Sequence, residues 1–198
     1  MSDTTAKPAA GDAILNVPNT LSLIRLVLSF VVFLLIGYQQ FRAANLIFLF
    51  AVATDWVDGY WARKYNQVTK FGRVLDPFVD KIIICGTFIY LAANPDSRVS
   101  AGAATIVVGR ELLVTALRSM IEGKGGDFSA KQLGKWKMVA QCAAAVSSMI
   151  LLQLGKDHVV SQTWLAYTTI GLVWFAVAIT IVSGAEYVKL AWGEMVRG

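Results

Sequence analysis

The sequence has few charged residues, cysteines and prolines, and these shortages exclude several classes of protein. Charged side chains make up 16% of the 198 residues, hydrophobic residues reach 56%, and the mean hydropathy is +0.57. Soluble domains are closer to a quarter charged, so this composition excludes a disordered tail, a coiled coil and an ordinary cytosolic domain. The two cysteines lie within apolar runs, which excludes a disulfide framework and a zinc ribbon. The chain is therefore expected to be an integral membrane protein.

Six apolar runs are each close to the roughly 20 residues that a helix needs to cross a bilayer. They cover residues 20–40, 43–64, 77–93, 99–122, 132–153 and 162–188. The sequence therefore predicts an all-α integral membrane protein with six transmembrane helices. Residues 1–198 are expected to form a single membrane domain, with a polar segment over 1–17 and a six-helix bundle over 18–190. Pro18 and Asn19 are expected to mark the start of the first helix, with Asn19 as a capping residue.

The lysines and arginines between the predicted spans predict how the protein lies in the membrane. The side that holds the N-terminus carries 11 of the 18 Lys and Arg residues, and the opposite side carries three, Arg42, Arg98 and Lys156. Loops rich in Lys and Arg stay in the cytoplasm, so both termini are expected there. The net charge of +5 would then face lipid headgroups and phosphates. Nucleic acid is not an expected partner, because no basic helix or aromatic platform stands outside the spans.

Four aspartates fall within 26 positions of this apolar chain. Each would cost about 2.5–3.5 kcal/mol at the middle of a membrane. Asp55 and Asp58 are three positions apart, and Asp76 and Asp80 are four apart, so each pair shares one helix face. The first pair lies near the cytoplasmic end of the second span, and the second pair opens the third span, with Pro77 at its start. A short connection would make the two spans antiparallel neighbours, so the pairs are expected to converge.

Converging carboxylates need cations to stay ionised in a partly dry site. Oxygen ligands favour a hard ion such as Mg²⁺ or Mn²⁺, and four carboxylates match two divalent ions, an arrangement that recurs in displacement at phosphorus. The alternative is that the aspartates reach solvent or pair with the nearby cations Arg63, Lys64, Lys70 and Arg73. Small residues and an arginine beside the aspartates fit a nucleotide-linked phosphate: Gly59, Ala62, Arg63 and Gly72.

Residues 55–80 read DWVDGYWARKYNQVTKFGRVLDPFVD and contain the pattern D-x2-D-G-x2-A-R-x8-G-x3-D-x3-D. This pattern resembles the signature of the CDP-alcohol phosphotransferase family of membrane enzymes. The resemblance extends over nearly the whole chain, because members of that family have six transmembrane helices with the signature across the second and third. It implies transfer of a phosphatidyl-type group from a CDP-linked lipid to an alcohol, with release of CMP.

The resemblance also implies a role for each residue of the signature. One metal ion would be held by Asp55, Asp58 and Asp76, and a second by Asp58, Asp76 and Asp80, both being Mg²⁺ or Mn²⁺. The CDP-lipid would be bound by Asp58, Gly59, Ala62, Arg63, Gly72 and Asp76. Asp80 would also be the catalytic base that takes the proton from the attacking hydroxyl. A homodimer is a further implication of the resemblance.

A second set of charged residues bears on the acceptor alcohol. Arg110 and Arg118 are eight positions apart in the fourth span, and arginines inside a membrane helix usually mark a polar pathway. Lys135 and Lys137 open the fifth span, where an ordinary cytoplasmic flank explains them equally well. These cations suit an acceptor that carries a phosphate. Glu111 is either the packing partner of an arginine or a substrate contact.

The stretches VPNTLSLIR and GREL–LR look most like the bacterial phosphatidylglycerophosphate synthase branch of the family. That branch implies CDP-diacylglycerol as donor, sn-glycerol 3-phosphate as acceptor, and a bacterial inner membrane location with the active site facing the cytoplasm. Asn19 and Arg25 would line the acceptor site, although a helix cap and a charge that extends to the interface explain them almost as well. Met138 departs from the branch, where Thr is common. The alternative is the same chemistry with an inositol phosphate or another alcohol as acceptor. A divalent-cation transporter is a distant alternative, because the four aspartates gather at one end of their helices.

Overall fold

In the computed structural model, the described residues are 17–65, 70–122, 132–157 and 163–197, and they form helices joined by short connections, without a strand among them. The elements are α1 (Val17–Gly37), α2 (Phe41–Tyr65), α3 (Lys70–Ala92), the 3-10 turn η1 (Pro95–Ser97), α4 (Ala101–Glu122), α5 (Gln132–Lys156) and α6 (Thr163–Arg197). In this part of the chain α1, α5 and α6 are long and apolar enough to cross a membrane, and α2 has a shorter apolar stretch over Phe41–Thr54. The predicted all-α membrane fold is confirmed.

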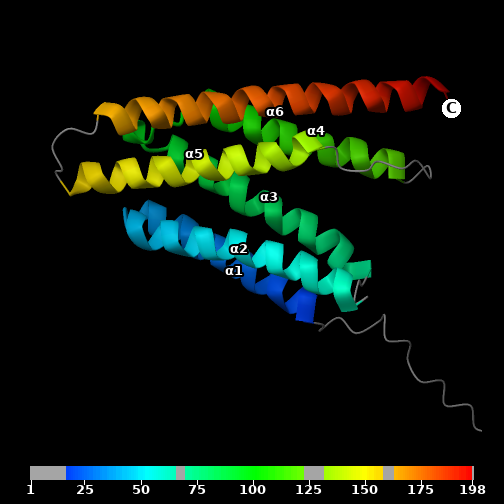
Figure 1. Cartoon of the computed structure of the whole chain (residues 1–198), viewed down its shortest axis with the longest axis horizontal. Helices are drawn as coiled ribbons and strands as arrows, with labels where there is room; N and C mark the ends of the chain where they lie inside the picture. The colour runs from blue at the N-terminus through cyan, green and yellow to red at the C-terminus, as the bar shows by residue number, and fades with distance from the viewer. Residues whose placement is uncertain (1–16, 66–69, 123–131, 158–162, 198) are drawn as a thin grey trace, which may run out of the picture.

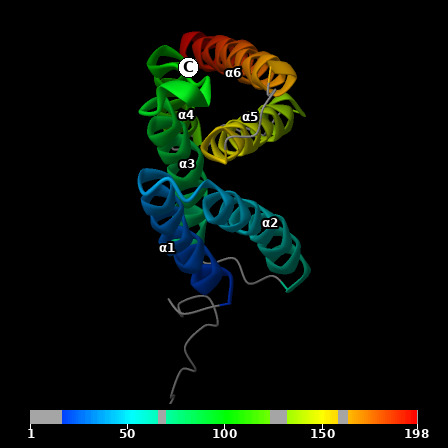
Figure 2. The same ribbon diagram turned by 90° about the vertical axis from the view of Figure 1, so that its left-hand side faces the viewer.

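Successive helices run back and forth, with α1, α2 and α3 inclined to α5 and α6, and the start of α1 and the end of α6 lie at the same end of the bundle (Figure 1). That end, where α2 finishes and α3 begins, is called here the α2–α3 end, and the opposite end, which carries η1, is the η1 end. Helix α1 packs along α2 and α3, while α6 packs along α4 and α5. Helix α3 contacts both α4 and α5 and so joins the two halves (Figure 2).

Several polar side chains lie inside the bundle beside its apolar core, and many large apolar side chains lie on its surface. Gln141 is 1% exposed and donates to the Thr180 hydroxyl at 3.1 Å, which links α5 to α6 in the interior. Leu46, Trp164 and Trp192, in contrast, are each 70% exposed. Water would disfavour this distribution, whereas lipid favours it, because lipid solvates apolar side chains and leaves polar groups to bond with one another.

A glycine lets α1 and α3 approach closely. The ring of Phe33 lies over Gly86, where an added Cβ would come within 2.1 Å of the ring. The same ring stacks on Tyr90, with 5.3 Å between the ring centroids. This contact continues into a core to which all six helices contribute buried residues. The packing fixes α1 against α3, the helix that carries Asp80.

Two helix starts differ from the sequence-based predictions. Helix α1 begins at Val17, so Asn19 lies in its first turn and is not a capping residue ahead of the helix. Helix α3 begins at Lys70, which places Pro77 inside the helix and not at its start. Proline has no N–H to donate to the carbonyl four residues earlier, so the helix continues through one missing hydrogen bond. A prediction based on apolar runs misses this first part of the helix, because residues 70–76 include several charged side chains.

The η1 end is held together by polar contacts between the α1–α2 turn and the end of α5. Arg42 donates through Nη2 to Asp157 at 2.5 Å, and Gln153 donates to the other oxygen of the same carboxylate at 2.8 Å. Lys156 donates to the backbone carbonyl of Gln39 at 2.9 Å. Hydrogen bonds from Gln153 and Arg42 hold the pKa of Asp157 below its ordinary value. Two of the three cations predicted for the outer loops therefore take part in one network.

Candidate functional site

A cavity of about 410 Å³ opens between α3, α4, α5 and α6 and is called here the basic cavity. Its lining comprises Asp80, Lys81, Ile84, Arg110, Glu111, Val114, Thr115, Arg118, Gly134, Lys137, Met138, Gln141 and Tyr187. The structure thus brings the predicted base, Asp80, into one space with three of the residues predicted to bind the acceptor. Those three, Arg110, Arg118 and Lys137, come from two different helices.

The charge of this lining suits an anion. Four of the lining side chains are cations, namely Lys81, Arg110, Arg118 and Lys137, and two are carboxylates, Asp80 and Glu111. The net charge of the lining is therefore +2. A phosphate monoester carries between about −1.5 and −2 at pH 7, so the two charges nearly balance.

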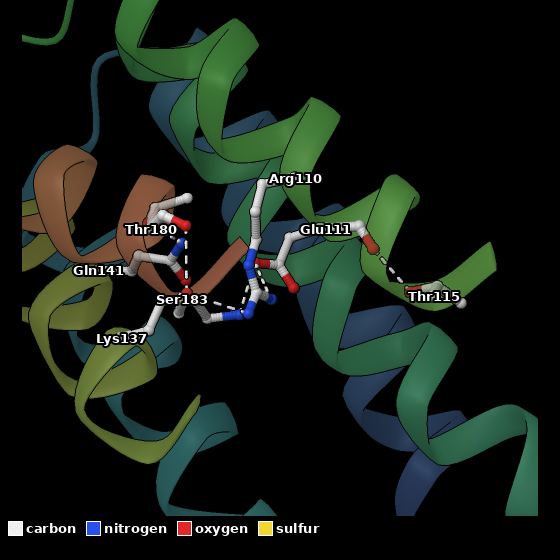
Figure 3. A network of polar contacts seen from close by, with 7 residues as sticks. All are labelled: Arg110, Glu111, Thr115, Lys137, Gln141, Thr180 and Ser183. Atoms are coloured by element: carbon white, nitrogen blue, oxygen red, sulfur yellow. Dashed lines mark hydrogen bonds and ion pairs between the residues drawn. The ribbon is translucent and has the colours of Figure 1, made fainter. Parts of the chain in front are cut away.

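Glu111 ties the cations of α4 and α5 together. Its Oε1 accepts from Lys137 Nζ at 2.5 Å and lies 3.4 Å from Arg110 Nη1. The guanidinium also reaches across to α6, where Nη2 donates to the hydroxyl of Ser183 at 3.0 Å (Figure 3). All these side chains are largely buried, at 7% exposure for Glu111, 9% for Arg110 and 10% for Lys137. Glu111 thus packs against an arginine, one of the two roles that the sequence left open for it.

Two buried donors in the cavity lining have no hydrogen-bond partner among the described residues. They are the Nε atoms of Arg110 and Arg118. A buried donor without a partner costs about 1–3 kcal/mol. A phosphate entering the cavity would offer several charged acceptor oxygens to these two donors.

Arg25 contacts the predicted base directly. Its Nη1 donates to Asp80 Oδ1 at 2.9 Å, and its side chain is 2% exposed, compared with 32% for Asp80. This burial does not fit a side chain that extends to the membrane interface. Arg25 belongs to a buried polar face of α1 that also includes Asn19, Ser22 and Ser29, at 1%, 2% and 0% exposure. Their spacing along one helix face is a signal that the sequence already contains. Neither Arg25 nor Asn19 lines the basic cavity. Arg25 instead contacts Asp80, which does line it.

For the rest of the aspartate signature the structure describes the backbone alone. This applies to Asp55, Asp58, Gly59, Ala62 and Arg63 in α2, and to Gly72 and Asp76 in α3; it also applies to Lys135 in α5. The side chains of these residues lie outside the described part, so their predicted roles stay predictions. Five peptide units join Tyr65 to Lys70, which limits the separation of the helix ends to about 18 Å. Four carboxylates with oxygen donors only are a set that fits hard divalent cations.

Several residues of the cavity were not predicted from the sequence. Lys81 directly follows the signature, and Gln141 and Tyr187 project from α5 and α6. In α6 the polar side chains Thr180, Ser183 and Tyr187 recur at intervals of three and four residues within an apolar helix. That interval places them on one face, and it is the sequence signal that could have identified α6 as part of the site.

Comparison with known proteins places the chain in a family. The sequence model of the family described as CDP-alcohol phosphatidyltransferase matches residues 15–182. A Bacillus subtilis (strain 168) protein named CDP-diacylglycerol--glycerol-3-phosphate 3-phosphatidyltransferase is 35% identical, over 89% of this chain and 95% of its own length. Proteins of the same name from Escherichia coli (strain K12) and Pseudomonas fluorescens are 31% and 29% identical, each over 91% of this chain, and over 97% and 92% of their own lengths. The chain, with its helical membrane fold and its basic cavity beside Asp80, belongs to the CDP-alcohol phosphatidyltransferase family.

Proposed function

We propose that this protein transfers a phosphatidyl group from CDP-diacylglycerol to sn-glycerol 3-phosphate, forming phosphatidylglycerophosphate and releasing CMP. One observation carries the proposal: Asp80 of the signature shares a cavity with Arg110, Arg118 and Lys137, which carry the positive charge that a phosphorylated acceptor requires. The names of the bacterial relatives support the same donor and acceptor.

The residues of the cavity divide the work between binding and proton transfer. Arg110, Arg118 and Lys137 would bind the phosphate of the acceptor, which directs one of its two free hydroxyls toward Asp80. The hydroxyl oxygen forms a bond to the phosphorus of the phosphatidyl group, while the bond from that phosphorus to the CMP oxygen breaks. The proton of the hydroxyl passes to Asp80, whose carboxylate is held in position by Arg25 at 2.9 Å.

The donor would bind at the aspartate signature. Asp58, Gly59, Ala62, Arg63, Gly72 and Asp76 are the residues proposed to hold the CDP-lipid, and Asp55, Asp58, Asp76 and Asp80 are proposed to hold two Mg²⁺ or Mn²⁺ ions. When bound, the ions supply positive charge to the pyrophosphate as it breaks. Arg63 can give two parallel hydrogen bonds to one phosphate.

We place all six helices across the bacterial inner membrane, with both termini and the α2–α3 end in the cytoplasm. The excess of Lys and Arg on that side supports this orientation. The active site would then face the cytoplasm, where a soluble acceptor is available. A homodimer is the proposed assembly, and the molar mass of the purified protein in detergent, measured by light scattering, tests it.

Transfer of radiolabel from glycerol 3-phosphate into lipid by the purified protein tests the function. We expect transfer that needs CDP-diacylglycerol and Mg²⁺ and stops when a chelator is added. Asp80→Asn should lower CMP release by at least about 10²-fold, because a general base contributes that much or more. Asp96→Asn, in η1 at the other end of the bundle, is the matched control and should be fully active. Transfer to an inositol phosphate but not to glycerol 3-phosphate would refute the acceptor, and full activity of Asp80→Asn would refute the role of Asp80. Metal flux into sealed vesicles without any lipid turnover would instead favour a transporter.

A further inference from the structure

Three residues of α6 surround the side chain of Arg110, and together they are called here the arginine cradle: Ser183, Gly184 and Tyr187. Ser183 accepts the hydrogen bond from Arg110 Nη2 at 3.0 Å. The guanidinium carbon of Arg110 lies over the ring of Tyr187, 5.4 Å from its centroid, a geometry in which the ring attracts the cation. Both contacts cross from α4 to α6, 73 and more positions along the chain.

Gly184 makes room for the stem of the arginine. A Cβ at this position would lie 3.0 Å from Arg110 Cγ and 3.9 Å from Nε. The Cγ atom is near the base of the side chain and lies between two packed helices, so it cannot swing away as a side-chain tip could. A methyl group at position 184 would therefore push the stem of Arg110 by a few tenths of an ångström and shift the guanidinium with it. In contrast, Gly171 and Gly193 of the same helix have no atom within 4 Å of an added Cβ among the described residues.

A second hydrogen bond of Ser183 ensures that its hydroxyl oxygen accepts from Arg110. Ser183 donates its own hydroxyl proton to the Thr180 carbonyl at 3.1 Å, so the lone pairs of its oxygen are left for Arg110. Glu111 lies 3.4 Å from Nη1 of the same guanidinium. The hydroxyl of Ser183 and the ring of Tyr187 thus hold Arg110, a long residue with many rotamers, and Gly184 leaves space for its stem. Because Arg110 is already held in one orientation, its side chain loses less conformational entropy when a ligand binds.

We propose that Ser183, Gly184 and Tyr187 are positioning residues that set the affinity for the phosphorylated acceptor by holding Arg110 at the wall of the basic cavity. This inference rests on the proposed function, since it assigns Arg110 to the acceptor phosphate. The family match ends at residue 182, so the cradle lies beyond the residues that it covers. Acceptor affinity would then depend on the last helix as well as on α4 and α5.

Gly184→Ala is the test, with Gly193→Ala as its matched control. Both changes add one methyl group to α6, and both raise helix propensity equally. We expect Gly184→Ala to raise the KM for glycerol 3-phosphate about three- to tenfold, because a misplacement of about 1 Å can cost roughly 10²-fold and this shift is smaller. The kcat at saturating acceptor and the KM for CDP-diacylglycerol should change less than about twofold. Gly193→Ala should match the wild type in all three constants.

Variants at the other two positions keep the proposal testable if Gly184→Ala does not fold. Tyr187→Leu should raise the acceptor KM about three- to tenfold, and Tyr187→Phe, which retains the ring, should raise it less than Tyr187→Leu does. An acceptor KM that is unchanged in both Gly184→Ala and Tyr187→Leu would overturn the proposal. So would a fall in kcat alone, which is the result expected from general loosening of the bundle.

A second readout separates this inference from the proposed function. The purified protein is titrated with inorganic phosphate, and binding is measured by calorimetry. We expect weaker phosphate binding in Gly184→Ala than in the wild type and in Gly193→Ala. If the wild type did not turn over glycerol 3-phosphate at all, the proposed function would fail. The phosphate titration would still test whether the arginine cradle positions Arg110 for phosphate binding. Equal phosphate affinity in all three proteins would overturn it.

Discussion

Replacing Glu111 with Gln should lower the stability of the protein without weakening acceptor binding. Glu111 Oε1 accepts from Lys137 Nζ at 2.5 Å and lies 3.4 Å from Arg110 Nη1, and the three side chains are at most 10% exposed. Removing one partner of a buried ion pair costs about 3–5 kcal/mol. Gln retains an acceptor oxygen, so we expect the lower end, about 3 kcal/mol. For a chain of this length that corresponds to a fall in Tm of roughly 6–12 °C.

The expected effect on binding has the opposite sign. Loss of the Glu111 charge raises the net charge of the cavity lining from +2 to +3, since four cations would then face one carboxylate. The KM for glycerol 3-phosphate should therefore stay the same or fall, and added phosphate should raise the Tm of the variant more than that of the wild type. Thermal unfolding in detergent and steady-state kinetics measure both effects. Glu186→Gln in α6 makes the same charge change outside the cavity and serves as control. A raised KM with an unchanged Tm would refute this reasoning and assign Glu111 to the substrate.

Three further outcomes follow from the described contacts. Arg118→Ala should raise the KM for the acceptor roughly 10- to 100-fold with little change in kcat, as measured by CMP release, because a hydrogen bond to a charged group contributes about 1.5–3 kcal/mol. Arg25→Ala should reduce kcat and lower the Tm, and Arg25→Lys should recover part of both; the loss should be smaller than for a fully buried pair, since Asp80 is 32% exposed. Asp157→Asn should lower the Tm at neutral pH, and this difference should shrink as the pH falls. The reason is that a carboxylate with a lowered pKa stabilises the fold at a pH above the ordinary Asp pKa of about 3.9. This stabilisation is lost as the pH drops through the lowered pKa. A Tm difference that grows in acid would contradict the assignment of the Arg42 and Gln153 contacts.

Much of the helical framework could be predicted from apolar run length alone. The start of α5 at Gln132 is the predicted one, because the apolar part of the helix begins within its first two turns, after Lys135 and Lys137. The start of α3 was placed seven residues late, because charged residues precede its apolar part. Helix α6 extends to Arg197, beyond the predicted end at 188, since its last two turns mix apolar with charged residues.

Helix periodicity in the sequence also predicts some features of the site and not others. Arginines within an apolar helix identify Arg110 and Arg118 as candidates, and the structure brings both to one cavity with Asp80. The partner of each charge, however, lies far along the chain: Arg25 and Asp80 are 55 positions apart, and Arg110 and Ser183 are 73 apart. Helix periodicity defines which face a residue occupies, but not which helix packs on that face.

The two most exposed of the three exposed tryptophans in α6 lie near its ends and set a depth scale for the reaction. Trp164 and Trp192 are 28 positions apart, or about 42 Å along the axis, which equals the thickness of a bilayer with its headgroup regions. Tryptophan prefers those two boundaries. In the proposed orientation, with α6 along the bilayer normal, Gly184 would lie about 12 Å below the inner boundary, just under the headgroup layer. The proposed diacyl donor would then present its phosphorus at this level without leaving its leaflet, while the small water-soluble acceptor would have to descend to meet it.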